Sequence, residues 1–236
     1  MSMLKEPKVG AWSLIDSFHV LQAMLDTGLN FVVFDFEHGY WRKDQLATAV
    51  IMCRERGIYS VARIPKASSE WVQASYDAGT DILQVAGIRS QKDISEVARL
   101  TQFPPHGILG FSPWTPRGYS PAIFTNKNPK ISIQFEEISI LRKFLNDEIE
   151  LFEQLDSIFI GRYDLSVSMG VPGVIEDSEL MAYLEKATKK AFELGLSIGT
   201  VGKSGADLKV LTKMGLNFIS VGSDIQRLRD QNPVRG

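Results

Sequence analysis

The sequence predicts an α/β protein with a closed (β/α)8 barrel, the TIM-barrel architecture, and three observations lead to this prediction. Short apolar runs alternate with longer amphipathic stretches along most of the 236-residue chain. Glycines follow several amphipathic stretches, at the points where the chain must turn into the next apolar run. Eight such units favour a closed parallel barrel; an open doubly wound sheet is the alternative if one strand is miscounted.

Each predicted strand is a run of four to six mostly apolar residues, as expected for a parallel sheet that is buried on both faces. The expected strands are 9–14, 31–36, 59–64, 81–85, 131–135, 157–160, 196–200 and 218–221. Amphipathic periodicity predicts the helices 17–25, 45–56, 70–77, 92–100, 138–152, 179–194 and 206–214. Five of these helices precede a glycine that is suited to closing a helix: Gly28, Gly57, Gly79, Gly195 and Gly215.

One segment, residues 103–130, breaks this alternation because it is rich in proline and has weak periodicity. Long irregular segments inside compact folds are often functional, so we expect a lid over the site; the alternative is a disordered excursion. Four aromatic residues favour an ordered, packed loop: Phe111, Trp114, Tyr119 and Phe124. No linker-like stretch divides the chain, so we expect one domain over residues 1–236.

Composition and charge exclude several classes of protein. The 26 basic and 28 acidic residues nearly cancel, so no overall positive field would attract nucleic acid or an anionic membrane. No signal peptide and no run of about 20 apolar residues is visible, and we therefore expect a soluble, cytoplasmic protein. The single cysteine, Cys53, excludes an internal disulfide and a Cys-rich zinc site; we expect it in the core.

Polar side chains gather at the ends of the predicted strands, where barrel enzymes carry their chemistry. These strand-end residues are Asp35, Glu37, His38, Arg63, Gln84, Gln134, Glu136, Arg162, Asp164 and Asp224. Two carboxylates from neighbouring strands, Glu136 and Asp164, can hold Mg²⁺ or Mn²⁺ and leave positions for substrate. The alternative for both is helix capping or ion pairing at the barrel rim.

Three further side chains are candidates for proton transfer and anion binding. Asp35 and His38 are close enough in sequence for the carboxylate to orient the imidazole. Arg63 offers a planar fork of donors to a carboxylate or an oxyanion. The alternatives are a loop histidine for His38, and for Arg63 a structural ion pair with Glu37 or Asp35.

Two other chemistries are weighed from the sequence. Gly202-Lys-Ser204 resembles part of a phosphate loop, but Ser197 stands where a Walker motif needs glycine, so we reject that motif. A weaker phosphate site from Gly222, Ser223 and the backbone near Lys203 is an alternative. A Schiff-base mechanism is disfavoured because no lysine lies inside a predicted strand, Lys66 being the nearest.

Taken together, the strand-end motifs resemble those of the HpcH/HpaI aldolase family, the metal-dependent class II pyruvate aldolases that include 2-keto-3-deoxy-sugar-acid aldolases. The resemblance covers residues 9–228 and is carried by Asp35-Phe-Glu-His38, Val61-Ala-Arg63-Ile-Pro65, Phe103-Pro-Pro-His-Gly107, Gln134-Phe-Glu136, Gly161-Arg-Tyr-Asp164-Leu-Ser166 and Val221-Gly-Ser-Asp224. It implies a barrel in which Glu136 and Asp164 bind Mg²⁺ or Mn²⁺, with Co²⁺ or Zn²⁺ as other candidates. It also implies that pyruvate chelates this ion.

The resemblance further implies roles for the surrounding side chains. Arg63 would contact the keto or enolate oxygen, Gln134 would lie beside the metal, and Asp35 would orient His38 for proton transfer. The sequence departs from the family where Arg162 and Tyr163 replace Gly-Pro, in a turn whose backbone amides hold the pyruvate carboxylate. Leu109 stands where the family often has arginine, and we expect Arg117 in the predicted lid to compensate as a substrate ligand.

We therefore expect a lyase that reversibly cleaves a 4-hydroxy-2-oxo acid to pyruvate and an aldehyde. His38 with Asp35 would take the proton of the 4-hydroxyl group, and Arg63 would stabilise the enolate. The alternatives are a citrate-lyase-like acyl-CoA lyase and a non-catalytic sugar-acid-binding protein on the same barrel. The family implies a homo-oligomer, commonly a hexamer that is built from dimers exchanging a C-terminal helix; the short stretch 225–230 leaves no long helix to exchange.

Overall fold

The computed structural model describes residues 7–119 and 128–230, and these contain a closed barrel of eight parallel strands. Each strand pairs with the next one in the chain, and β8 closes on β1. The strands are β1 (Lys8–Ser13), β2 (Phe31–Asp35), β3 (Tyr59–Ile64), β4 (Ile82–Ile88), β5 (Lys130–Phe135), β6 (Leu155–Ile160), β7 (Ser197–Gly202) and β8 (Phe218–Ser223). The predicted (β/α)8 fold is confirmed.

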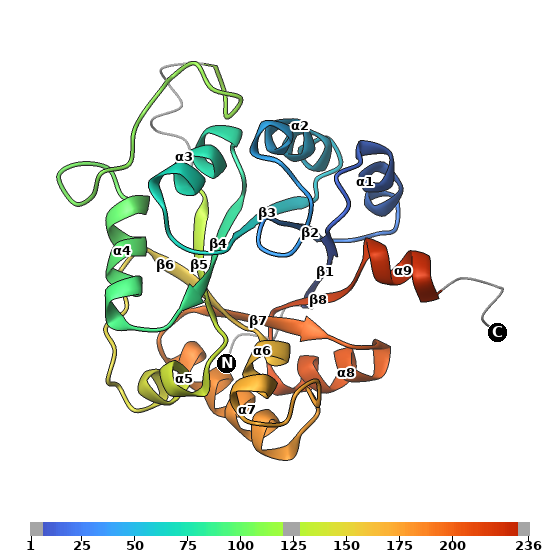
Figure 1. The fold of residues 1–236 in the computed structure, drawn as a ribbon, viewed down its shortest axis with the longest axis vertical. Helices are drawn as coiled ribbons and strands as arrows, with labels where there is room; N and C mark the ends of the chain where they lie inside the picture. The colour runs from blue at the N-terminus through green and yellow to red at the C-terminus, as the bar shows by residue number, and fades with distance from the viewer. Residues whose placement is uncertain (1–6, 120–127, 231–236) are drawn as a thin grey trace.

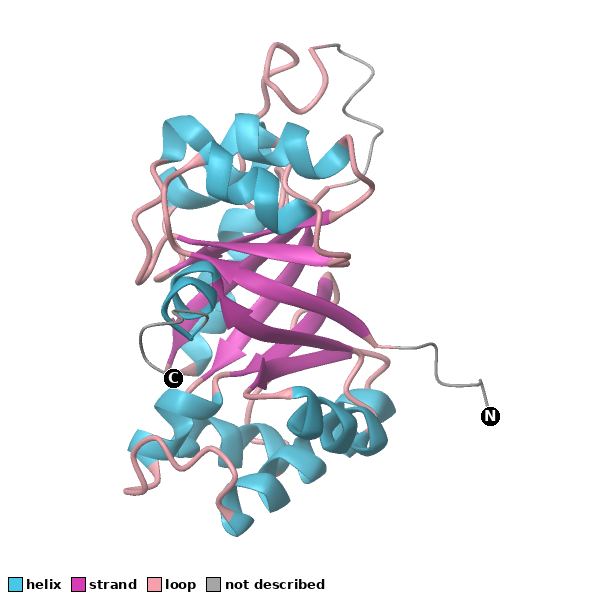
Figure 2. Ribbon diagram, turned by 90° about the vertical axis from the view of Figure 1, so that its right-hand side faces the viewer, coloured by secondary structure: helices cyan, strands magenta, loops and turns pink. Residues whose placement is uncertain are grey.

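The helices surround the barrel in chain order, and Figures 1 and 2 show the strands enclosed between them. They are α1 (Phe18–Leu25), α2 (Lys43–Arg54), α3 (Ser69–Ala78), α4 (Gln91–Thr101), α5 (Ile138–Leu145), α6 (Arg162–Ser168), α7 (Ser178–Glu193), α8 (Gly205–Met214) and α9 (Asp224–Asp230). None of these helices is long and apolar enough to cross a membrane.

Two helices differ from the prediction for identifiable reasons. The helix expected over 138–152 ends at Leu145, because Asn146 caps it and Asp147 adopts a left-handed conformation with φ of 60°. The helix α6 was not predicted, because its first turn holds polar residues that were assigned to a strand end. Gly79 and Gly215 adopt left-handed conformations at the ends of α3 and α8, as expected for helix-closing glycines.

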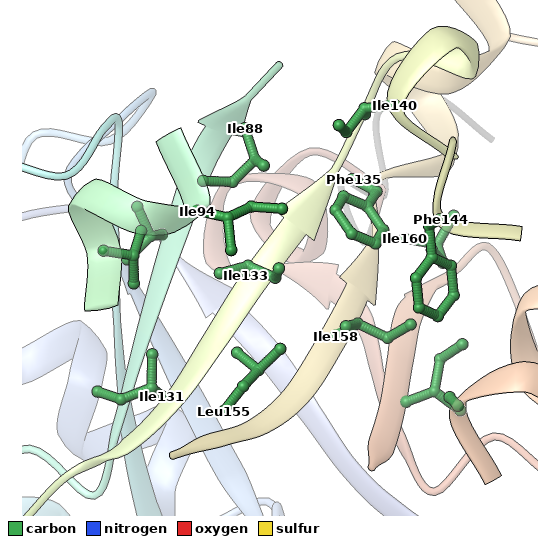
Figure 3. Close-up of a cluster of buried hydrophobic side chains, with 14 of the residues drawn as sticks. Ile88, Ile94, Ile131, Ile133, Phe135, Ile140, Phe144, Leu155, Ile158 and Ile160 are labelled. Atoms are coloured by element: carbon green, nitrogen blue, oxygen red, sulfur yellow. The ribbon is translucent and has the colours of Figure 1, made fainter. Parts of the chain in front are cut away.

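Side chains alternate between the two faces of the barrel wall. On β5 and β6 the outward residues Ile133, Phe135, Ile158 and Ile160 are fully buried against the surrounding helices. Figure 3 shows these side chains packed together, with Phe144 of α5 beside Phe135. The residues between them point into the barrel, and the same alternation on β2 and β3 turns Asp35 and Arg63 inward.

Aromatic rings fill the inside of the barrel near its amino-terminal end. Phe218 packs against Phe31 and Phe159, and Phe159 in turn contacts Trp12. Gly10 of β1 lies beside Phe31, and Gly199 of β7 lies beside Phe218 in the strand register. A Cβ atom on Gly199 would stand 2.2 Å from the Phe218 ring, so this position makes room for the ring.

One buried carboxylate, that of Asp224, connects the ends of the last strand, β8, and the first strand, β1. Asp224, at the start of α9, accepts hydrogen bonds from the backbone N–H groups of Leu14 and Ile15, both at 2.9 Å. It also accepts the N–H of Ile225. Asp224 therefore links the carboxyl ends of β8 and β1 as well as beginning the last helix.

The segment 103–130 leaves α4 and returns to β5, and its described parts lie at the amino-terminal end of the barrel. Gly110 donates to the Gln73 side chain, and the Arg117 N–H donates to the carbonyl of Asp77 near the end of α3 (Figure 1). The expected lid over the site is therefore wrong for these parts, because a connection from a helix to the next strand emerges at the opposite end. Residues 120–127, with Phe124, lie outside the described residues.

The aromatic packing inside the barrel predicts unequal effects of two glycine substitutions. Gly199→Ala places a methyl group against a ring that other aromatic rings hold, and we expect a loss of about 1–3 kcal/mol in unfolding free energy. Gly205→Ala, at the start of α8, meets nothing within 4 Å and serves as the matched control, with no loss expected. Urea denaturation measures both; equal losses would contradict the packing argument.

Candidate active site

A cavity of about 270 Å³ opens at the carboxyl-terminal end of the barrel. Its lining comes from the ends of β1 to β3 and β5 to β8 and from the segments that follow them: Trp12, Leu14, Asp35, His38, Arg63, Gln134, Phe159, Gly161, Tyr163, Asp164, Val201, Gly202, Lys203, Gly222, Ser223 and Gln226. Six of the sequence-predicted site residues are among them.

A buried ion pair forms one wall of this cavity. Arg63 donates from Nε to Asp35 Oδ1 at 2.9 Å and from Nη2 to Asp35 Oδ2 at 2.6 Å. The two residues lie side by side in the strand register, and both side chains are almost fully buried. The guanidinium also stacks over the Trp12 ring, 4.3 Å from its centroid. This bidentate pairing holds the Arg63 fork in one orientation.

The side-chain partner of Asp35 is therefore Arg63, the structural ion pair considered as an alternative, and not the His38 imidazole. The Asp35 carboxylate contacts Arg63 and accepts the backbone N–H groups of Glu37 and His38, at 3.0 and 3.2 Å. The His38 ring is 62% exposed, and its Nε2 lies 4.0 Å from Glu37 Oε2. Asp35 thus positions the backbone of His38, and the neighbouring carboxylate of the imidazole is Glu37.

Glu37, which the sequence offers only as a strand-end acid and a possible partner of Arg63, lies against the Arg63 guanidinium in the structure. Its Oε2 is buried 3.1 Å from Arg63 Nη1, yet no described group makes a hydrogen bond to it. Burial raises the pKa of Glu37, and the charges of Asp35 and Asp164 raise it further, against the lowering effect of Arg63 and His38. Glu37 is therefore a carboxylate with unsatisfied acceptor capacity facing other acids.

A chain of hydrogen bonds runs across β4 and β5 to the second predicted acid. Gln84 Nε2 donates to Gln134 Oε1 at 2.6 Å, and Gln134 Nε2 donates to Glu136 Oε1 at 2.7 Å. The other Glu136 oxygen accepts the Gly87 N–H at 3.0 Å. Burial raises the pKa of Glu136, as do the charges of Glu37 and Asp164, while the Gly87 bond opposes this.

The third acid is carried by the first turn of α6. Asp164 and Tyr163 line the cavity, and the charge of Asp164 acts on both Glu37 and Glu136. Gly161 begins this turn, and a Cβ atom there would stand 2.9 Å from Gln134 Nε2 and 3.0 Å from Glu136 Cγ. Glycine therefore lets the turn approach the side chains of β5 closely.

These residues fit a divalent cation. Glu37, Glu136 and Asp164 interact unfavourably with one another, and a cation would neutralise this repulsion. Hard oxygen ligands with several retained waters suit Mg²⁺ or Mn²⁺. Within residues 7–119 and 128–230, no three His, Cys, Asp or Glu side chains are grouped closely enough to hold a metal ion by themselves.

Three other predicted groups lie apart from this cluster. Arg117 stacks on the Tyr76 ring at the amino-terminal end of the barrel, so the structure does not bring it to the cavity of its own chain. Lys66 is exposed and is not among the cavity-lining residues. The Lys203 N–H, considered for a phosphate, already donates to Asp207 Oδ2 at 2.8 Å. Cys53 is buried in the core, as expected.

Sequence reasoning missed Trp12, Phe159 and Gln226 as lining residues. Trp12 lies near the end of the first predicted strand. The alternation of side chains along that strand predicts that Trp12 faces into the barrel, so it could have been identified from the sequence. Phe159 was read as an ordinary apolar strand residue. Gln226 follows the last strand by three residues, and no pattern distinguishes it.

Comparison with known proteins gives a family match over nearly the whole chain. The family model described as HpcH/HpaI aldolase/citrate lyase matches residues 8–231. A hydroxypyruvate/pyruvate aldolase of Agrobacterium fabrum is 24% identical over 226 residues, covering 93% of this chain and 84% of that protein. A 5-keto-4-deoxy-D-glucarate aldolase of Salmonella paratyphi C is 24% identical over 228 residues, covering 95% and 89%.

Solved structures share the fold. An HpcH/HpaI aldolase/citrate lyase family protein from Burkholderia cenocepacia superposes with a TM-score of 0.87 at 21% identity. The match covers 98% of this chain and 95% of that one. The shared barrel therefore extends to the full set of strands that carry the cavity.

The buried pair predicts that Asp35 contributes more to stability than Glu37. Asp35→Asn leaves the Arg63 charge buried beside a neutral partner, and we expect the unfolding free energy to fall by about 3 kcal/mol. Glu37→Gln removes a carboxylate whose ionised form burial already disfavours, and a smaller fall is expected. Urea denaturation in the presence of a chelator compares the two; a larger loss for Glu37→Gln would contradict the assignment.

Proposed function

The chain belongs to the HpcH/HpaI aldolase/citrate lyase family, and from this premise we propose that it is a divalent-metal-dependent class II pyruvate aldolase. It would reversibly cleave a 4-hydroxy-2-oxo acid, of the 2-keto-3-deoxy-sugar-acid type, into pyruvate and an aldehyde. The single observation that carries this proposal is the small cavity lined by Asp164, Arg63 and His38, with Glu37 and Glu136 near enough for the charge of Asp164 to act on both. The aldolases named among its relatives support the same reaction class.

Glu136 and Asp164 are the proposed ligands of the ion, which we propose to be Mg²⁺ or Mn²⁺, with Co²⁺ or Zn²⁺ also compatible with the oxygen ligands. When bound, the ion would supply Lewis acidity that stabilises negative charge on the 2-oxo group. Gln134 holds Glu136 in place through its 2.7 Å hydrogen bond. The backbone N–H groups of the turn at Tyr163 would hold the substrate carboxylate.

The remaining residues would bind charge and move the proton. His38 would accept the proton of the 4-hydroxyl group as the bond between C3 and C4 breaks and the aldehyde forms. The electron pair of that bond becomes the enolate of pyruvate, whose oxygen Arg63 would stabilise from its fixed orientation. Protonation at C3 then completes pyruvate.

The cavity favours this reaction over the cleavage of an acyl-CoA. Its volume of about 270 Å³ suits a small substrate, whereas most of a coenzyme A thioester would have to lie outside it. Parallel assays with 4-hydroxy-2-oxo acids and with acyl-CoA thioesters separate the two reactions. A sugar-acid-binding protein without catalysis would bind pyruvate but would not exchange its protons.

We also propose a homo-oligomer. Apolar side chains stand exposed on α6 and α9 beside the cavity: Val167, Ile225 and Leu228. Exposed apolar side chains of this size are candidates for contacts between subunits. Light scattering of the purified protein measures the oligomeric state.

The proposed metal ligands predict the loss of pyruvate proton exchange. We expect Mn²⁺-dependent deuterium incorporation at C3 of pyruvate in the parent protein, and its loss in Glu136→Gln and after treatment with a chelator. Glu137→Gln is the matched control, because Glu137 pairs with Arg89 at the surface and exchange should persist. Nuclear magnetic resonance follows the exchange. Persistence in Glu136→Gln would overturn the ligand assignment.

The proposed proton acceptor predicts a selective kinetic defect. His38→Asn should slow cleavage by about 100-fold to 10,000-fold while the protein still binds Mn²⁺. His19→Asn, on the exposed face of α1, is the control and should leave the cleavage rate unchanged. A lactate dehydrogenase-coupled assay of pyruvate release measures both. An unchanged rate in His38→Asn would assign the proton transfer to another group.

A further inference from the structure

A second buried ion pair lies directly behind the turn that carries Asp164. Arg162, the first residue of α6, is fully buried, and its Nη2 lies 2.5 Å from Asp207 Oδ2 of α8. Gly161, Tyr163 and Asp164 line the cavity, whereas Arg162 does not. Burying an arginine side chain costs free energy unless its N–H groups donate hydrogen bonds and its charge is paired. The groups that accept these hydrogen bonds therefore indicate the structural role of Arg162.

The Arg162 guanidinium joins several segments of the chain. It donates from Nε to the carbonyl of Val201 in β7 at 3.0 Å, and from Nη1 to the carbonyl of Ile175 before α7 at 3.2 Å. Asp207 accepts from the same guanidinium and from the N–H of Lys203 at the end of β7. One side chain therefore ties the β6–α6 turn to β7, to the segment before α7 and to α8.

The same turn is held from its inner side. Gly161 donates its N–H to the carbonyl of Phe135 at 3.0 Å, and its missing side chain admits Gln134 and Glu136. Asp164 follows Arg162 by two residues within one helical turn. Its placement relative to Glu136 thus depends on Gly161 against β5 and on Arg162 against β7 and α8.

We propose that the Arg162–Asp207 pair is a positioning element that holds Asp164 beside Glu136 and thereby sets the affinity of the site for its divalent ion. This inference rests on the proposed function, because it assigns Asp164 and Glu136 as ligands. Arg162 does not touch substrate. It acts through the backbone of the turn, as outer residues that orient metal ligands commonly do.

The test is the Mn²⁺ affinity of purified variants, measured by electron paramagnetic resonance of the free ion. Arg162→Lys keeps the positive charge but replaces the planar guanidinium by a single ammonium group. The ammonium group cannot donate at once to the Val201 carbonyl, the Ile175 carbonyl and the Asp207 carboxylate. We expect the dissociation constant of this variant for Mn²⁺ to rise about 10-fold to 100-fold. The pyruvate exchange rate should recover towards the parent value at saturating Mn²⁺, which a general loss of folded protein would not produce.

A second variant and a control separate positioning from folding. Arg162→Met combined with Asp207→Leu removes both buried charges, a change that often preserves stability, and should weaken Mn²⁺ binding similarly. Asp81→Asn disturbs the hydrogen bonds to Ser60 at the amino-terminal end of the barrel and should leave Mn²⁺ affinity unchanged. Circular dichroism establishes that each protein is folded.

The outcomes distinguish this inference from the function on which it rests. If the parent binds Mn²⁺ and both Arg162 variants bind it equally tightly, the pair is only structural and the inference is overturned. If Asp81→Asn weakens binding as much as Arg162→Lys, affinity follows stability alone, and the inference is again overturned. If the parent protein binds no Mn²⁺, the proposed function is overturned, and the inference that depends on it is overturned as well.

Discussion

The buried ion pair between Asp35 and Arg63 is the interaction on which the cavity depends. A closed barrel turns alternate strand residues inward, so any charge on an inward position must find a partner inside the barrel. Asp35 and Arg63 occupy neighbouring positions of β2 and β3 and satisfy each other in a bidentate arrangement. Because both oxygens of Asp35 are engaged, the arginine is fixed, and Glu37 and His38 are placed by backbone hydrogen bonds to the same carboxylate.

Glu37, Glu136 and Asp164 lie close enough for their negative charges to repel one another. Burial and mutual repulsion raise the pKa values of Glu37 and Glu136, and the hydrogen bonds from Gln134 and Gly87 offset the cost only at Glu136. Such a cluster stores unfavourable energy in the folded chain. A bound divalent ion would relieve it, which is the physical basis of the proposed metal site.

The order of the strands and the inward residues could be predicted from the sequence, because both follow from short-range patterns of apolar and polar residues. The choice between two partners of Asp35 could not. The sequence offers both His38 and Arg63 as partners, and the barrel register places Arg63 beside Asp35; register is a property of two strands together. Arg162 was similarly ambiguous, because only the folded barrel brings Asp207, 45 residues later, against it.

The described parts of the segment 103–130 lie away from the cavity because of the connectivity of the fold. In a barrel, a connection from a helix to the following strand emerges at the end opposite the catalytic loops, and Gly110 and Arg117 accordingly contact α3. Proline and aromatic content indicate an irregular, packed loop. They do not indicate at which end of the barrel the loop lies, which follows from its connection between α4 and β5. Arg117 was assigned to the substrate for the same reason, and its contact with Tyr76 follows from that connectivity.

The aromatic filling inside the barrel has a consequence for the order of events during turnover. Phe31, Phe159 and Phe218 close the interior below the cavity, and Gly10 and Gly199 give these rings the space to do so. The pocket is therefore closed towards the amino-terminal end of the barrel, and its lining lies at the carboxyl-terminal end. A ligand on the aromatic floor of this pocket would have to leave after any ligand bound above it.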